Sequence, residues 1–78
     1  MNKPVDYLDI LKQVCKKIFP DIEINNDSDF FELGGTSVDV VKLSSEFNRK
    51  TGITIDIATV YEYSTLSELA EYLSQNQD

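Results

Sequence analysis

Apolar side chains recur along the N-terminal part of the chain with the spacing of an amphipathic helix. This spacing predicts a helix from Val5 to Phe19 with one buried stripe. The stripe contains Tyr7, Leu8, Leu11, Val14, Cys15 and Ile18. Pro4 fits the first turn, and Pro20 marks the end because a residue before proline is disfavoured in the α region. The single cysteine, Cys15, is interpreted as a small buried hydrophobic side chain rather than a reactive thiol.

A second apolar stripe predicts a helix from Ser37 to Lys50. Its inward positions are Val40, Leu43, Ser44 and Phe47. Thr36 and Asp39 form a capping box of the [ST]-x-x-[DE] type at the start of this helix. Gly52 is suited to its end because glycine adopts the left-handed conformation at little cost.

Shorter elements follow the second helix. The segment from Ile53 to Ile57 alternates like a strand, but in an otherwise helical chain it is interpreted as an extended linker whose isoleucines fill the core. A short helix is expected from Ile57 to Tyr61 or Tyr63, with Asp56 as its N-cap.

The last helix is predicted to begin at Thr65, which forms a second capping box with Glu68. Its apolar stripe contains Leu66, Leu69, Ala70 and Leu73. The polar residues 74–78 are expected to form a frayed tail. Together these elements predict an all-α fold in one domain over residues 1–78, a small bundle of three main helices and one short helix.

Residues 20–36 form a long connection between the first two helices. The side chains expected to anchor it are Ile22, Ile24, Phe30, Phe31 and Leu33. A loop of this length in so small a domain is usually functional or held by its own side chains. Its carboxylates at Asp27, Asp29 and Glu32 suggest a calcium loop, but the ligand pattern of an EF-hand is absent. A solvated acidic loop is the preferred interpretation.

Composition and charge narrow the class of protein. The chain has 78 residues, of which 41% are hydrophobic, enough for one folded domain. It has no membrane-spanning run, no signal-peptide pattern and one cysteine, so a cytoplasmic protein without disulfides is expected, and the Met1 start favours a free-standing one. The net charge is −7, with +2 over residues 1–20 and −9 over residues 21–78. This balance disfavours nucleic acid and favours partners with basic patches.

The chain contains no histidine, which removes the commonest general base and metal ligand. With a single cysteine in addition, metal sites built on imidazole or thiolate are excluded. A Ser-His-Asp triad cannot be built either, so no catalytic residue is assigned.

Ser37 is the candidate functional residue. It follows the tight turn Gly34-Gly35-Thr36 and falls in the first helical turn, where its hydroxyl is expected to be exposed near unpaired backbone N–H groups. The pattern alone allows either a serine of the capping region without a chemical role or a site of attachment. Val38 and Val41 share an offset face and either widen the core contact or form an exposed apolar patch, for which Val38 is the better candidate.

The stretch from Asp29 to Val38 resembles the attachment motif of phosphopantetheine carrier domains. It is closest to the thiolation, or peptidyl carrier, domains of nonribosomal peptide synthetases and related polyketide systems, and the resemblance extends over the whole chain. It implies that Ser37, flanked by Gly35 and Thr36, receives 4′-phosphopantetheine from coenzyme A through a magnesium-dependent phosphopantetheinyl transferase. The domain then carries acyl or aminoacyl groups as thioesters and catalyses nothing itself.

The resemblance also implies protein partners and a monomeric carrier. These partners are an adenylation or loading enzyme and downstream condensation, modifying or thioesterase enzymes, with no nucleic acid or membrane among them. The residues expected to contact them are Val38, Asp39, Val41 and Lys42.

The chain departs from related carriers at a few positions. Fatty-acid carriers usually have Asp and Leu where this chain has Thr36 and Val38, which points away from fatty-acid synthesis. Asp39 replaces an apolar residue of many peptidyl carriers, and Tyr61 and Tyr63 are unusual residues that pack under the loop or meet a partner. Two alternatives remain: an acyl carrier of a polyketide or fatty-acid-like pathway, and a helical interaction module that is never modified.

Overall fold

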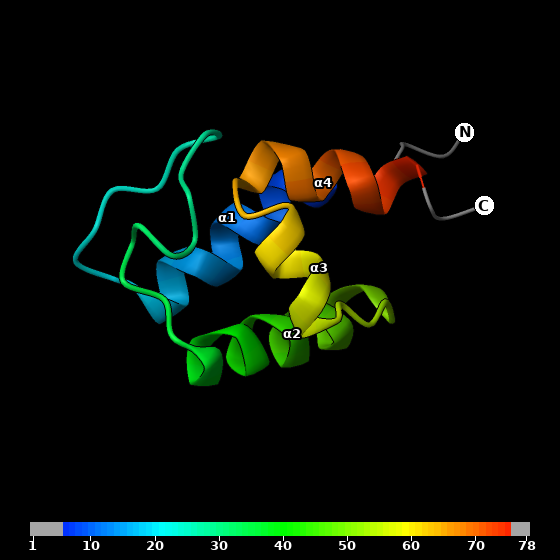
Figure 1. Ribbon diagram of the computed structural model, residues 1–78, viewed down its shortest axis with the longest axis horizontal. Coiled ribbons are helices and arrows are strands. Elements are labelled where there is room, and N and C mark those ends of the chain that lie inside the picture. Colours follow the sequence, from blue (N-terminus) through cyan, green and yellow to red (C-terminus); the bar gives the residue numbers. More distant parts are fainter. Residues whose placement is uncertain (1–5, 76–78) are drawn as a thin grey trace.

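The computed structural model describes residues 6–75 and contains helices but no strands in that range (Figure 1). The helices are α1 (Tyr7–Ile18), α2 (Ser37–Thr51), α3 (Ile57–Glu62) and α4 (Leu66–Gln75). The predicted all-α fold with three main helices and one short helix is therefore confirmed. Helix α1 begins at Tyr7, later than the expected start near Val5, because Asp6 is its N-cap and accepts a hydrogen bond from the Asp9 N–H. The residues Ser74 and Gln75, expected in a frayed tail, belong to α4 instead. The placement of Pro4 and residues 76–78 lie outside the described residues.

Helix α1 lies at the centre of the bundle, packed against α4 on one side and α2 on the other (Figure 1). The short α3 crosses between α2 and α4, and the long loop closes the end of the bundle where α2 begins. The core draws on all four helices and the loop. It contains Leu11, Val14, Cys15, Ile24, Phe30, Val40, Leu43, Phe47, Ile55, Val60, Leu66, Leu69, Ala70 and Leu73.

The C-terminal ends of α1 and α2 lie within one residue of the predicted positions. Helix α1 stops at Ile18, with Phe19 as its C-cap, and α2 continues one residue beyond Lys50 to Thr51. Gly52 ends α2 with φ of 80°, and its N–H donates to the carbonyl of Asn48. A left-handed residue at this point satisfies carbonyl groups that the helix leaves open.

Asp56 and Thr65 stand where their N-cap roles were expected. The Asp56 side chain makes no capping hydrogen bond, although the residue directly precedes α3. The Thr65 hydroxyl accepts a hydrogen bond of 3.2 Å from the Glu68 N–H and donates one of 2.9 Å to the Glu68 carboxylate. The start of α4 is thus tied by its capping residue.

The predicted burial of two apolar side chains is wrong. Ile22 and Ile57 are exposed rather than buried. Ile22 lies in the turn that follows α1, where its N–H bonds back to the Phe19 carbonyl and its side chain faces solvent. Of the linker isoleucines, Ile55 is buried and Ile53 half-buried, so the linker fills the core with two of its three isoleucines.

Cys15 lies in the core, as predicted from the apolar stripe. Its side chain is fully buried, and burial raises the pKa of its thiol to about 12. A thiol with this pKa is almost entirely protonated at neutral pH, so it is a poor nucleophile.

Candidate functional site

A single capped helical turn precedes α2. It begins at Asp29, whose carboxylate accepts hydrogen bonds from the N–H groups of Phe31 at 2.9 Å and Glu32 at 3.2 Å. The Leu33 N–H then bonds to the Asp29 carbonyl at 3.0 Å, which closes one α-helical turn. Asp29 is therefore an N-cap residue, a role that the sequence analysis did not assign to it.

The same turn ends in a Schellman motif that uses both glycines. The Gly35 N–H bonds to the Phe30 carbonyl and the Gly34 N–H to the Phe31 carbonyl, each at 3.1 Å. Gly34 has φ of 98°, a conformation that side-chain-bearing residues rarely adopt. Gly35 lies so close to Phe30 that a Cβ atom on it would stand 2.5 Å from the ring. Gly34 is required because of its positive φ angle, and Gly35 because there is no room for a side chain.

Hydrogen bonds hold this turn against the connection between α3 and α4. The Ser64 hydroxyl donates to the Asp29 carboxylate at 2.7 Å, and the Phe30 N–H bonds to the Ser64 carbonyl at 2.8 Å. The Ser64 hydrogen bond is the main cause of the lowered pKa of Asp29. The loop preceding α2 is thus fixed by residues far along the chain.

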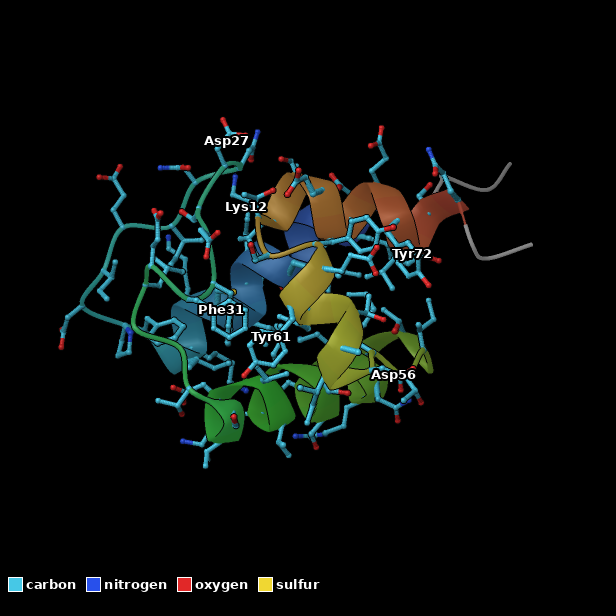
Figure 2. The ribbon with its side chains drawn as sticks, in the orientation of Figure 1. Lys12, Asp27, Phe31, Asp56, Tyr61 and Tyr72 are labelled. Carbon is cyan, nitrogen blue, oxygen red and sulfur yellow. The ribbon has the colours of Figure 1, made fainter. Side chains whose placement is uncertain are left out.

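The tip of the loop is held in the same way at the start of α4. The Leu66 N–H bonds to the Ser28 carbonyl at 3.0 Å, and the Ser67 N–H bonds to the Asn26 carbonyl at 2.9 Å. The Ser67 hydroxyl also donates to the carboxylate of Asp27, which Figure 2 shows at the tip of the loop beside α4. The tip of the acidic loop is therefore held in place by hydrogen bonds to the first turn of α4.

Aromatic rings pack against the turn from Asp29 to Gly35. Phe30 is buried and makes edge contacts with Phe19 and Phe31, with ring centroids 5.6 and 5.7 Å apart. Phe31 stacks on Tyr61 of α3, with centroids 4.6 Å apart and planes 9° from parallel. Figure 2 shows the two labelled side chains next to each other. The Tyr61 side chain is still 57% exposed. Tyr61 therefore packs against the loop and leaves surface for a partner.

Tyr63 has a different neighbour. It stacks on Tyr72 of α4, with centroids 4.6 Å apart and planes 22° from parallel. The charge of nearby Glu62 is the main cause of the raised pKa of Tyr63. This pair joins the end of α3 to α4, so Tyr63 serves packing rather than the loop.

Ser37 is the first residue of α2 and its side chain is exposed. Ser37 lies between the two residues of the predicted capping box. The Thr36 hydroxyl accepts a hydrogen bond of 3.3 Å from the Asp39 N–H, and the Asp39 carboxylate accepts one of 3.1 Å from the Thr36 N–H. The Ser37 hydroxyl makes no hydrogen bond to any residue in the range 6–75. The arrangement presents an unpaired hydroxyl on a rigid helix start.

Val38 and Val41 are both exposed, Val38 by 64% and Val41 by 55%. Of the two interpretations left open by the sequence, the exposed apolar patch is the one observed. The side chains on the opposite face of the helix, Val40 and Leu43, are fully buried. Lys42 lies on the exposed side with its ammonium 4.0 Å from the Asp39 carboxylate.

Acidic groups of the loop do not gather into a metal site. Over the part of the chain that the structure describes, no three carboxylate or thiol side chains come together in a way that could hold a metal ion. Asp29, one of the three residues of the calcium alternative, is occupied by the hydrogen bonds of its own turn. Within residues 6–75, no helix is long and apolar enough to cross a bilayer.

A local signal for the Asp29 cap was present in the sequence. Asp29 and Glu32 have the spacing of an N-cap and its third helical residue, as in the two predicted capping boxes. The partner Ser64 lies 35 residues further along the chain, and no local pattern contains that pairing.

Comparison with models of protein families matches residues 8–73 to the family described as phosphopantetheine attachment site. Nonribosomal peptide synthetase 6 of Alternaria brassicicola is 41% identical over 63 residues, which are 81% of this chain and 4% of that protein. Hybrid PKS-NRPS synthetase 1 of Dothistroma septosporum is 41% identical over 51 residues, which are 65% of this chain and 1% of that protein. The chain thus spans only a few hundredths of the length of these relatives.

A solved structure titled Non Ribosomal PCP domain matches with a TM-score of 0.75. It is 26% identical in sequence, and the match covers 90% of each chain. The helical arrangement of Figure 1 is therefore shared along nearly the whole chain.

Proposed function

This chain belongs to the phosphopantetheine attachment site family, and from that premise we propose that Ser37 is the residue that bears 4′-phosphopantetheine. The supporting observation is the exposed hydroxyl of Ser37, which has no hydrogen-bond partner within residues 6–75 and stands at the start of a 15-residue helix. The first backbone N–H groups of α2 have no partners within the helix and favour a phosphate at this end. The residues present therefore fit the group.

The chain supplies the acceptor and leaves the chemistry to another enzyme. Attachment would join the Ser37 Oγ atom to the phosphorus of the phosphopantetheine part of coenzyme A. The pyrophosphate bond would break, and adenosine 3′,5′-bisphosphate would leave. The hydroxyl proton needs a base, and the nearest carboxylate on the same helix, that of Asp39, is engaged by Thr36. With no histidine in the chain, the base and the magnesium ion come from the transferase. The chain is the substrate of that step and not an enzyme.

The attached arm would end in a thiol that holds an acyl or aminoacyl group as a thioester. The chain would then carry such intermediates in nonribosomal peptide or hybrid peptide and polyketide biosynthesis, the classes named for the relatives. Its partners would be an adenylation or loading enzyme and the condensation, modifying or thioesterase enzymes that follow. Modification would take place in the cytoplasm, where coenzyme A is available.

The exposed face of α2 beside Ser37 is the proposed surface for these partners. Val38 and Val41 provide apolar area, and Asp39 and Lys42 provide a charged border. Exposed apolar side chains flanked by polar groups are typical of transient protein contacts. Such a small patch suits binding that must release the partner after each transfer.

Intact mass spectrometry tests the assignment of Ser37. The purified chain is incubated with coenzyme A, magnesium and a transferase of broad specificity, and the wild type is expected to gain one phosphopantetheine. Ser37→Ala should gain none, whereas the matched variant Ser74→Ala, which alters an exposed serine on α4, should react like the wild type. An unmodified but folded wild type would contradict the proposal and favour the helical interaction module.

A further inference from the structure

Within residues 6–75 the basic side chains are confined to two helices, whereas acidic side chains occur in every part of the fold. Every lysine and arginine within residues 6–75 lies on α1 or α2. The loop 19–36 and the segment 52–75, which contains α3 and α4, have acidic residues and no basic ones. In a protein with a net charge of −7, α1 and α2 are therefore the two helices whose basic residues outnumber their acidic ones.

A shallow groove of about 400 Å³ lies between α1 and α2. It is lined by Lys17, Ile18, Val41, Lys42, Ser45 and Glu46. The apolar part of the groove comes from Ile18, which is half-buried, and from Val41, which is 55% exposed. Val41 also belongs to the patch beside Ser37, so the groove is continuous with the surface proposed for partners.

The one carboxylate of the groove is already paired. Glu46 accepts a hydrogen bond of 3.2 Å from the Lys17 ammonium and one of 3.1 Å from the Arg49 guanidinium. These two cations hold the pKa of Glu46 below its usual range, chiefly through the hydrogen bond from Lys17. Two cations on one carboxylate leave a local surplus of positive charge at this end of the groove.

Lys42 forms the other border of the groove and is only loosely engaged. Its ammonium lies 4.0 Å from the Asp39 carboxylate, and its side chain is 62% exposed. Asp39 in turn is held by Thr36. An incoming carboxylate can therefore pair with Lys42 without displacing a close salt bridge.

We propose that the groove between α1 and α2 docks an acidic segment of a partner protein, with one apolar side chain against Ile18 and Val41 and carboxylates at Lys17 and Lys42. This inference deepens the proposed function, because it gives the chemistry of a partner that reads the face next to Ser37. It reverses for this surface the expectation of basic partners that the overall charge suggests. Complementary charge would speed the encounter and set the register of docking.

Nuclear magnetic resonance with three short peptides tests the proposal on protein that is not modified at Ser37. One peptide has leucine flanked by glutamates, the second has lysines in place of the glutamates, and the third has glutamines. The glutamate peptide is expected to shift the amide signals of Ile18, Val41, Lys42 and Ser45, with weaker binding as salt screens the charges. The lysine peptide should shift signals of the acidic loop and α4 instead.

Charge-neutral variants sharpen the test. Lys42→Gln should weaken binding of the glutamate peptide about fivefold, the loss expected for one exposed charge pair. The matched variant Lys50→Gln, which alters an exposed lysine of α2 outside the groove, should bind as the wild type does. Circular dichroism confirms that both variants fold.

Two results would overturn the proposal. The first is a glutamate peptide that leaves the groove signals unmoved, or that moves them no more than the lysine peptide does. The second is a shift of these signals with protein concentration alone, which would identify a second copy of the chain as the occupant. Neither result depends on whether the transferase modifies Ser37, so failure here is separate from failure of the proposed attachment site.

Discussion

The residues before Ser37 and the residues after it are organised in opposite ways. Before it, the turn from Asp29 to Gly35 is held by its own hydrogen bonds and by those to Ser64, and rests on the buried ring of Phe30. After it, the side chains of Val38 and Val41 are exposed to solvent and do not belong to the core. One side of the serine is closed by contacts within the protein, and the other leaves its surface open.

If Ser37 is the attachment site, as proposed, this difference separates the positioning of its hydroxyl from the recognition of partners. The closed side sets where the hydroxyl stands, because Gly35 lies against Phe30 and Thr36 caps the helix that begins at Ser37. The open side can be read by other proteins. We therefore expect changes on the closed side to act on stability, and changes on the open side to act on partner binding alone.

Among the changes to the closed side, removal of the Phe30 ring should lower the free energy of unfolding most. Phe30→Ala is expected to lower the free energy of unfolding by roughly 3–5 kcal/mol, because it deletes a fully buried ring and leaves a cavity under the turn. Urea unfolding followed by circular dichroism measures the loss. A loss below about 1 kcal/mol would show that the turn does not depend on this ring.

A methyl group at Gly35 should have the next largest effect. Its Cβ would stand 2.5 Å from the Phe30 ring and 2.7 Å from the Phe30 carbonyl oxygen, so the ring or the backbone must shift. Gly35→Ala is expected to cost about 1–3 kcal/mol and to slow modification of Ser37, since the shift displaces the start of α2. Unfolding and transferase kinetics measure the two effects, and a normal rate in a destabilised variant would contradict the second.

Loss of the Asp29 carboxylate should have a smaller effect that depends on pH. Asp29→Ala removes a cap and the hydrogen bond from Ser64, and is expected to cost about 1–2 kcal/mol at pH 7. The pKa of Asp29 is lowered by folding from an ordinary value of 3.8, so its contribution is present above that pH and is lost as the pH falls through the lower folded pKa.

Unfolding of the wild type and of Asp29→Ala between pH 7 and pH 2 checks this dependence. The gap between the two proteins should narrow only below about pH 4, where the carboxylate becomes protonated. Asp21→Ala is the matched control, because Asp21 is exposed in the same loop and forms no hydrogen bond with residues 6–75. An equal loss in the control would mean that net charge, and not the cap, is responsible.

The smallest change in stability is expected on the open side. Val38→Ala should alter the free energy of unfolding by no more than about 0.5 kcal/mol, because the side chain is mostly in solvent. It should nevertheless slow transfer between the modified chain and a partner enzyme. The buried neighbour Val40→Ala serves as contrast, with an expected stability loss of about 2 kcal/mol. A large stability loss in Val38→Ala would erase the distinction between the two sides.

Much of the fold could be predicted from periodicity and capping signals. The capping box of Thr36 and Asp39 and the glycine at position 52 define α2 to within one residue, since both signals are local. The burial of Ile22 and Ile57 was predicted wrongly. An isoleucine in a turn or at a helix start has no stripe to assign its side, so hydrophobicity alone was a poor guide there.

The candidate site shows the same contrast between local signals, which the sequence contains, and tertiary packing, which it does not. The exposure of Ser37 follows from its place in the first helical turn, which the sequence shows. The orientation of Val38 and Val41 could not be decided from the sequence, because it depends on where α1 and α3 cover α2. The hydrogen bond from Ser64 to Asp29 depends in the same way on tertiary packing.

The bonds between the loop tip and the start of α4 determine what can be exchanged between related domains. A graft of α2 alone would transfer the exposed side chains but would sit on a turn built by the host. A graft of the turn before Ser37 would need Ser64, Leu66 and Ser67 as well, because these residues hold residues 26–30 in place. The side chains proposed to contact partners can therefore be transferred with one helix. The geometry of the proposed attachment site can be transferred only together with a second segment that is distant in the sequence.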